Sequence, residues 1–144
     1  RARSTMRPRP SAKPIDGQYG HDVGDMLLRE VAQRLKENVR DSDTVSRQGG
    51  DEFIILVTEL PEAEQMIQLG QKLLHILGEP YHIDGHELRV TPSIGVAVYP
   101  EDGEDIDTLT KNADTAMYRA KGAGRNSLEC YNHGLNALAR SSLF

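Results

Sequence analysis

Cysteine is nearly absent from this sequence, since Cys130 is the only one. A single cysteine can form neither an intramolecular disulfide bond nor a cysteine-rich zinc site, so we expect a protein of the reducing cytoplasm. Long apolar runs are missing as well. No stretch approaches the roughly 18 residues of a membrane-spanning helix, and the first residues lack the apolar core of a signal peptide. The sequence therefore predicts a soluble chain without membrane contact.

A surplus of positive charge is also missing. The chain has 17 Lys and Arg residues against 22 Asp and Glu residues, a formal net charge of -5. This balance excludes the clustered basic surface that is typical of proteins binding nucleic acid. Free nucleotides remain possible ligands, because a few well-placed cations are enough to hold their phosphates. The 144 residues have room for one domain with a buried core.

Residues 1–14 carry four arginines, one lysine and three prolines without apolar periodicity. This composition is typical of disordered segments. Proline cannot donate a hydrogen bond to a neighbouring strand, so Pro8 and Pro10 argue against a central strand here. We expect residues 1–14 to form a disordered basic segment.

Beyond this segment the pattern predicts helices alternating with strands. Apolar residues recur at helical spacing over 23–39, after Pro61 up to about Gly78, and over 106–121. Strands are expected on both sides of Gly49 and Gly50, in a hairpin centred on Asp84 and Gly85, at 93–100 and at 127–131, with a short amphipathic helix over 134–144. The predicted fold is an α/β sandwich with a central mixed β-sheet flanked by helices.

The stretch "SRQGGDEFIILVTEL" at 46–60 places two glycines before two carboxylates. One interpretation is a hairpin turn, because glycine supplies the positive φ angle that tight turns need and acidic residues keep a turn soluble. The other is a nucleotide site, in which backbone without side chains lets a phosphate approach and Asp51 and Glu52 hold a hard cation such as Mg²⁺. This stretch alone does not decide between them.

Four stretches together are similar to a known family: "YGHDVGD" (19–25), "RDSD" (40–43), "GGDEF" (49–53) and "ADTAMYRAKGAGRN" (113–126), with "SIGVAVYP" between the last two. From Ile15 to about Tyr131 the chain resembles the GGDEF family of diguanylate cyclases. The resemblance implies a nucleotide-cyclase-like fold and the condensation of two GTP into cyclic di-GMP and pyrophosphate. It also implies catalysis by a homodimer in which each subunit presents one GTP.

The resemblance assigns roles at the catalytic site. Gly49 and Gly50 would lie beside the phosphates, Asp51 would bind Mg²⁺ (or Mn²⁺), and Glu52 would be required for turnover. Lys121 and Arg125, which are four residues apart, would hold the terminal phosphates. For these two cations the alternative is a solvated helix end, where positive charge is favourable in any case.

Three further positions concern the guanine base. Asp25 matches the carboxylate that accepts hydrogen bonds from guanine, which adenine cannot offer in the same pattern. Leu28 matches a position that packs against the base, although leucine on a helix is more often a core residue. Asp16 stands where the family has a guanine-binding asparagine. His21 is expected to support the helix start rather than to act as a ligand.

Arg40 and Asp43 match the family's product-inhibition site, at which cyclic di-GMP binds. The Arg-x-x-Asp pattern is common, and a surface ion pair is its alternative interpretation.

The resemblance fails before Ile15. The family begins with a helix and a central strand that ends in Asp-x-Asp-x-Phe-Lys-x-Ile-Asn-Asp, and its first aspartate is the other metal ligand. Here Pro8 and Pro10 stand where the aspartates belong, Ala12 replaces the aromatic residue and Gly17 the last aspartate. We therefore expect a GGDEF domain over 15–131 without its first helix and central first strand.

These differences predict an impaired cyclase. The alternative is a non-catalytic regulatory module that binds GTP or cyclic di-GMP. Residues 132–144 resemble the helix or linker that often joins such domains to a phosphodiesterase domain with a Glu-Ala-Leu (EAL) motif, so a fused EAL or sensor domain is expected as a partner.

Overall fold

The chain folds around a five-stranded sheet with the order β2-β3-β1-β6-β7. The computed structural model describes residues 4–10, 21–58, 62–123, 126–132 and 134. Only β6 and β7 run parallel to each other, and the other neighbours are antiparallel, so the sheet is mixed, as predicted. The strands are β1 (Ser4–Arg9), β2 (Thr44–Gly49), β3 (Glu52–Val57), β6 (Ser93–Ala97) and β7 (Ser127–Cys130).

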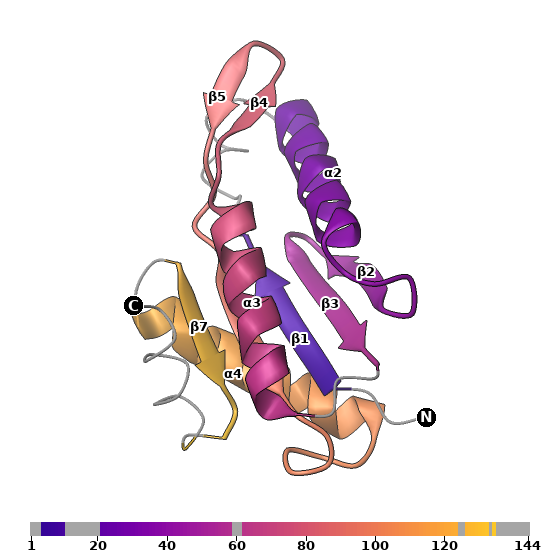
Figure 1. Cartoon of the computed structure of the whole chain (residues 1–144). Coiled ribbons are helices and arrows are strands. Elements are labelled where there is room, and N and C mark those ends of the chain that lie inside the picture. Colours follow the sequence, from indigo (N-terminus) through magenta and orange to yellow (C-terminus); the bar gives the residue numbers. More distant parts are fainter. Residues whose placement is uncertain (1–3, 11–20, 59–61, 124–125, 133, 135–144) are drawn as a thin grey trace.

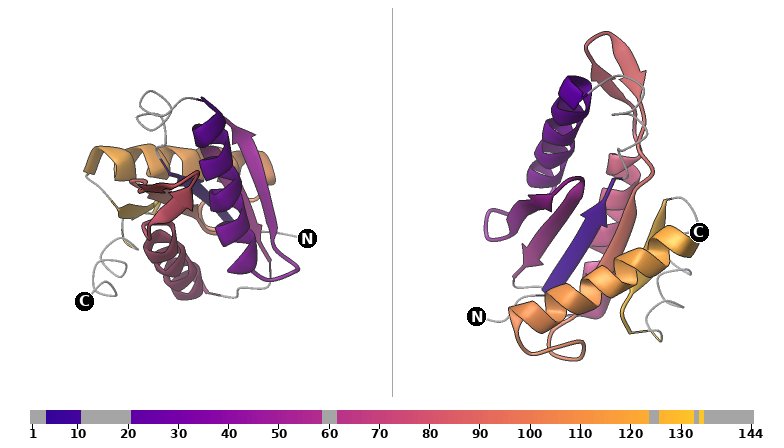
Figure 2. Two further views of the ribbon diagram at one scale, coloured as in Figure 1. Left: turned by 90° about the horizontal axis from the view of Figure 1, so that it is seen from above. Right: turned by 180° about the vertical axis from the view of Figure 1, so that it is seen from behind.

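Three helices cover the two faces of this sheet (Figures 1 and 2). Helices α2 (His21–Glu37) and α3 (Ala63–Leu77) lie on one face, and α4 (Ile106–Ala123) lies on the other. All three were predicted from their apolar periodicity, with ends within a few residues. Among the described residues, none of the helices combines the length and apolar character needed to span a bilayer. The predicted helix at 134–144 lies outside the described residues, except for Gly134.

A second, two-stranded sheet is formed by β4 (Tyr81–Ile83) and β5 (His86–Leu88). The turn between them uses positive φ angles at Asp84 (51°) and Gly85 (80°). Such angles are easiest for glycine and for short polar residues. The predicted hairpin is therefore confirmed at the predicted residues.

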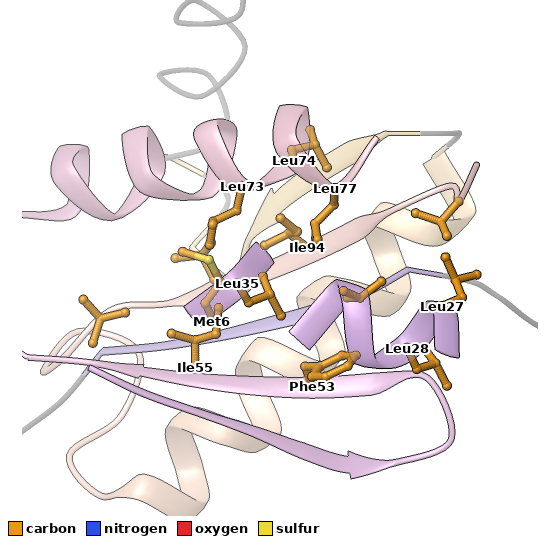
Figure 3. Close-up of a cluster of buried hydrophobic side chains, with 14 of the residues drawn as sticks. Met6, Leu27, Leu28, Leu35, Phe53, Ile55, Leu73, Leu74, Leu77 and Ile94 are labelled. Atoms are coloured by element: carbon orange, nitrogen blue, oxygen red, sulfur yellow. The ribbon is translucent and has the colours of Figure 1, made fainter. Parts of the chain in front are cut away.

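The main core lies between the sheet and helices α2 and α3 (Figure 3). Met6 of β1 is fully buried at its centre, close to side chains from both helices and from β3 and β6. The fully buried apolar side chains labelled in Figure 3 include Met6, Leu27, Leu35, Phe53, Ile55, Leu73, Leu77 and Ile94. Burial of apolar side chains such as these is the main favourable contribution to folding.

The prediction that residues 1–14 are disordered, and that the central first strand is missing, is wrong for residues 4–9. Strand β1 occupies the middle of the sheet, between β3 and β6. Pro8 is tolerated because β1 pairs with β3 only from Ser4 to Met6, so Pro8 faces a paired strand on one side alone, opposite Ile94 of β6. The expected loss of the family's first helix concerns residues that the structure does not describe.

Candidate functional site

The turn between β2 and β3 is built by Gly49 and Gly50. Their φ angles are 123° and 51°, a backbone conformation that other residues rarely adopt. A Cβ atom at either position would have no heavy atom within 4 Å, so open space borders both glycines. Arg47 closes the turn by donating from Nε to the carbonyl oxygen of Gly50 at 2.7 Å. The turn interpretation is therefore confirmed, and the backbone also remains accessible to a ligand.

The two carboxylates after the turn are held by arginines of β1. Arg9 Nε donates to Asp51 Oδ1 at 3.2 Å, and Arg7 Nη2 donates to Glu52 Oε1 at 2.8 Å. Arg9 Nη1 also lies 3.5 Å from Glu52 Oε2. The side chains of Arg7, Arg9 and Asp51 are at most 10% exposed, whereas Glu52 is 26% exposed. Both carboxylates thus have a guanidinium group beside them.

Helix α4 completes this cluster from the other side. Asp114 Oδ1 lies 3.3 Å from Arg7 Nη2, so Arg7 sits between two carboxylates. The Tyr118 hydroxyl donates to Glu52 Oε2 at 3.4 Å, and its ring centroid lies 5.8 Å from Arg9 Cζ. We call Arg7, Arg9, Asp51, Glu52 and Asp114 the arginine–carboxylate cluster. Two guanidinium groups face three carboxylates there, which leaves a formal charge of about -1.

Sequence reasoning missed Arg7 and Arg9, because it assigned them to a disordered segment. A signal was present in the spacing, since residues two apart on a strand share a face. Arg7 and Arg9 both face α4. Met6, which directly precedes Arg7, faces the core on the opposite side of the strand. That alternation is typical of a strand with a polar and an apolar face.

Two of the positions predicted to bind the base, Asp25 and Leu28, lie one turn apart on α2. Asp25 is exposed, while Leu28 is buried in the main core, which supports the core interpretation of that leucine. Lys121 is exposed near the end of α4. Arg125 and Asp16 lie outside the described residues, and so does the side chain of His21.

Arg40 and Asp43 stand in the loop between α2 and β2. The Asp43 carboxylate accepts hydrogen bonds from two backbone N–H groups, that of Arg40 at 3.0 Å and that of Thr58 at 3.1 Å. Within the described part of the chain, the guanidinium group of Arg40 forms no ion pair with Asp43. Asp43 therefore organises the loop, and Arg40 is exposed beside it.

Shifted pKa values occur away from the cluster. Burial raises the pKa of Tyr81 to about 12 and that of the Cys130 thiol to about 12. Burial also raises the pKa of Asp102, against the effect of the Val98 N–H that donates to its carboxylate. A thiol with a raised pKa is a poor nucleophile. Since burial is the first cause at all three residues, they do not indicate a second reactive site.

Comparison with known proteins gives the family. The family model described as "Diguanylate cyclase, GGDEF domain" matches residues 12–127, most of the chain. The chain belongs to the GGDEF family. Within this GGDEF domain, Asp51, Glu52, Asp114 and Tyr118 lie in the matched region, whereas Arg7 and Arg9 lie before it. The arginines of the cluster thus come from a strand that the family model does not cover.

Individual relatives agree with this family. The bifunctional diguanylate cyclase/cyclic di-GMP phosphodiesterase MucR of Pseudomonas aeruginosa is 45% identical over 131 residues, 91% of this chain and 19% of MucR. The response regulator PleD of Caulobacter vibrioides is 39% identical over 118 residues, 81% of this chain and 26% of PleD. The chain therefore spans about a fifth to a quarter of the length of these relatives.

The solved structures agree on the fold. The crystal structure of the GGDEF domain of YfiN, or TpbB, from Pseudomonas aeruginosa has a TM-score of 0.85 at 31% identity, covering 89% of this chain and 81% of that chain. An EAL/GGDEF domain protein from M. capsulatus has a TM-score of 0.82 at 39% identity, covering 90% and 85%. The predicted nucleotide-cyclase-like fold is confirmed.

The divalent metal that the family implies does not fit these residues. Mg²⁺ requires several oxygen ligands in nearly octahedral geometry, usually including one or two carboxylates. In the described part of the chain, no group of three or more His, Cys, Asp or Glu side chains could hold a metal ion. The carboxylates of Asp51 and Glu52 instead face guanidinium groups.

Proposed function

We propose that this GGDEF domain is a diguanylate cyclase domain whose condensation of two GTP into cyclic di-GMP and pyrophosphate is impaired. The observation that carries the proposal is the contact of Arg7 and Arg9 with Glu52 and Asp51. In this reaction a ribose 3′-hydroxyl attacks an α-phosphate, and negative charge grows on the phosphate oxygens. Positive charge directed at those oxygens would stabilise the transition state. In this chain the positive charge of the guanidinium groups is directed at the carboxylates of Asp51 and Glu52 instead.

Glu52 would assist turnover, but its oxygens already have partners. Oε1 accepts from Arg7, and Oε2 lies near Arg9 and the Tyr118 hydroxyl. Because these contacts occupy both oxygens, the carboxylate has to give up partners before it can contact a substrate. A restrained Glu52 therefore supports slow turnover in this chain.

Substrate binding is proposed on the family's pattern. Gly49 and Gly50 would let the phosphates approach, because open space borders both residues. Lys121 and Arg125 would hold the terminal phosphates. Asp25 would recognise the guanine edge, with Asp16 beside the base. Asp25 and Lys121 are exposed, which supports contact with a ligand.

The remaining partners follow from the same pattern. Catalysis would need a homodimer, and cyclic di-GMP would be both product and inhibitor through Arg40 and Asp43. A fused sensor or EAL domain is proposed because this chain spans 19% of MucR, a protein with both activities in its name. The single cysteine supports a cytoplasmic location for this bacterial second-messenger domain. Mg²⁺ or Mn²⁺ is the family's expected cofactor.

The second candidate is a non-catalytic regulatory module that binds GTP or cyclic di-GMP. The restrained carboxylates favour it, and so does the exposed Arg40. A regulatory module would bind GTP or cyclic di-GMP without forming any cyclic di-GMP, whereas the impaired cyclase would form it slowly.

The test is product formation from GTP, measured by chromatography in buffer with Mg²⁺. The 144-residue chain is compared with a variant that restores the family's strand residues and removes both arginines: Arg7→Leu, Pro8→Asp, Arg9→Leu, Pro10→Asp and Ala12→Phe. Asp51→Ala is the blank. We expect the original chain to be slower by on the order of a hundredfold. A rate within tenfold of the restored variant would overturn the impairment, and binding with no product above the blank would favour the regulatory module.

A further inference from the structure

We propose that Arg7 and Arg9 take the place of a divalent cation at the GGDEF carboxylates, so that Asp51 and Glu52 are held in position without metal. The inference builds on family membership and on the arginine–carboxylate cluster, and it is independent of how fast the domain turns over GTP. It concerns a strand that lies before the region matched by the family model.

The contacts of the two carboxylates already supply positive charge to their oxygens. Arg9 Nε lies 3.2 Å from Asp51 Oδ1, and Arg7 Nη2 lies 2.8 Å from Glu52 Oε1. Guanidinium groups do not lose their proton under conditions in which proteins fold, so this positive charge is permanent. A metal ion would supply the same sign of charge to the same oxygens. The arginines therefore fulfil the electrostatic requirement of the carboxylates.

A divalent ion would compete with the arginines for the same carboxylate oxygens. A divalent ion at Asp51 would lie within a few ångströms of Arg9, and like charges at that distance repel strongly in a partly buried site. The ion would also have to displace guanidinium groups that are at most 10% exposed. A buried charge that loses its partner is strongly unfavourable. Of the two carboxylates, Glu52 is 26% exposed and Asp51 is 6% exposed, so solvent reaches the cluster on the side of Glu52.

The fold holds both arginines beside the carboxylates. Arg7 and Arg9 belong to the central strand, where they pair with Gly95 and Ser93 of β6. Asp114 of α4 holds Arg7 from the other side, and the Tyr118 ring lies beside Arg9. Neither side chain can leave the carboxylates without losing contacts to α4 as well. Contacts from the β2–β3 hairpin and from α4 therefore hold the two arginines beside the carboxylates.

The experiment measures Mn²⁺ binding to the complete 144-residue chain by electron paramagnetic resonance of free Mn²⁺. The chains compared are the original, Asp51→Asn, Arg9→Gln, Arg9→Lys and the double variant Arg9→Gln with Asp51→Asn. We expect the original chain and Asp51→Asn to bind Mn²⁺ equally weakly. Arg9→Gln should bind one Mn²⁺ at least tenfold more tightly, the double variant should lose that site, and Arg9→Lys, which keeps the charge, should resemble the original.

Two results would overturn the proposal. The first is one Mn²⁺ bound by the original chain with an affinity that Asp51→Asn lowers tenfold or more. The second is an unchanged affinity in a folded Arg9→Gln chain, which would show that ligands are lacking rather than blocked. The comparison of the original with Asp51→Asn does not need Arg9→Gln to fold. As a further check, the melting temperature of the original chain should not rise in about 1 mM Mn²⁺, because a ligand that binds the native state would stabilise it.

These outcomes are separate from the proposed function. Mn²⁺ bound at Asp51 together with slow turnover would contradict only the replacement of the cation. Rapid turnover without a site at Asp51 would contradict only the impaired cyclase.

Discussion

At the scale of single residues, three aspartates show how the groups around a carboxylate decide what it can do. Asp51 is buried and faces the guanidinium group of Arg9. Asp43 uses both oxygens on backbone N–H groups and holds a loop together. Asp25 is exposed on α2. Of the three, Asp25 is the carboxylate that we propose for recognition of an incoming base.

Asp25 should make the domain prefer GTP to ATP. Guanine presents paired N–H donors to a carboxylate, and adenine does not. We expect Asp25→Ala to weaken GTP binding by about 1.5–3 kcal/mol, the range for hydrogen bonds to a charged group, and to leave ATP binding unchanged. Calorimetry at fixed Mg²⁺ measures both. Glu30→Ala, which removes another exposed carboxylate of α2, is the control. Equal affinities of the original chain for GTP and ATP would refute the role of Asp25.

At the scale of elements, short connections are fixed by side chains that reach backbone groups. Arg34 of α2 donates from Nη1 to the carbonyl oxygens of Ile76 at 3.0 Å and Glu79 at 2.9 Å, and so satisfies groups at the end of α3. Its guanidinium group also stacks on the Tyr81 ring, with 3.5 Å between Cζ and the ring centroid. Asp43 has the same function in the loop before β2.

That loop gives a prediction about cyclic di-GMP. The Arg40 side chain is exposed, so Arg40→Ala should not disturb the fold. We expect this change to weaken binding of cyclic di-GMP by about 1.5–3 kcal/mol, because a charge-assisted contact is lost. Isothermal titration calorimetry measures it. Asp43→Ala is a poor test, since it also removes the hydrogen bonds to Arg40 and Thr58. An unchanged titration for Arg40→Ala would show that Arg40 does not bind the product.

The elements that local patterns could predict were those with regular spacing. The helical periods of α2, α3 and α4 and the turn residues Asp84 and Gly85 identified their elements, because these signals are local in sequence. Strand β1 has only Met6 as a large apolar residue and contains Pro8. Its side-chain contacts join residues 42 and 45 positions apart. Such contacts leave no local pattern in the sequence, and Pro8 and the basic composition argued against the short alternation around Met6.

The candidate site likewise contains residues that the sequence predicted and residues that it did not predict. Asp51, Glu52 and the glycine turn could be predicted, because the motif is continuous and glycine has a backbone requirement at that turn. The arginines that neutralise the carboxylates could not, since they depend on where β1 lies in the sheet. The assignment of Asp51 as a metal ligand came from the family pattern, whereas the ion pair of Asp51 with Arg9 is visible only in the structure.

At the scale of the whole molecule, the cluster depends on α4 lying close against the sheet. Gly95 of β6 allows this approach. A Cβ atom there would collide with the carbonyl oxygen of Ala113 and the backbone nitrogen of Met117. Both are backbone atoms, so no side-chain adjustment could relieve the collision. The distance between α4 and the sheet in turn sets the contact of Asp114 with Arg7.

Gly95→Ala should therefore be strongly destabilising. We expect a loss of about 3 kcal/mol or more in the free energy of unfolding, because a rigid backbone contact has to open. Denaturant titration followed by circular dichroism measures it. Gly122→Ala is the matched control on α4, since a Cβ there meets no atom within 4 Å. Alanine in a helix is favoured over glycine, so the control should gain up to about 1 kcal/mol. Equal stabilities of the two variants would contradict the close packing of α4.

The central claim is that guanidinium groups, and not a metal ion, stand at Asp51 and Glu52. The most direct measurement is a crystal structure of the complete chain grown with Mn²⁺ and a non-hydrolysable GTP analogue, with diffraction data collected at the manganese absorption edge. We predict that no anomalous peak is bonded to either carboxylate and that Arg9 Nε lies within hydrogen-bond distance of Asp51. A manganese peak bonded to Asp51, with Arg7 and Arg9 turned away, would contradict it.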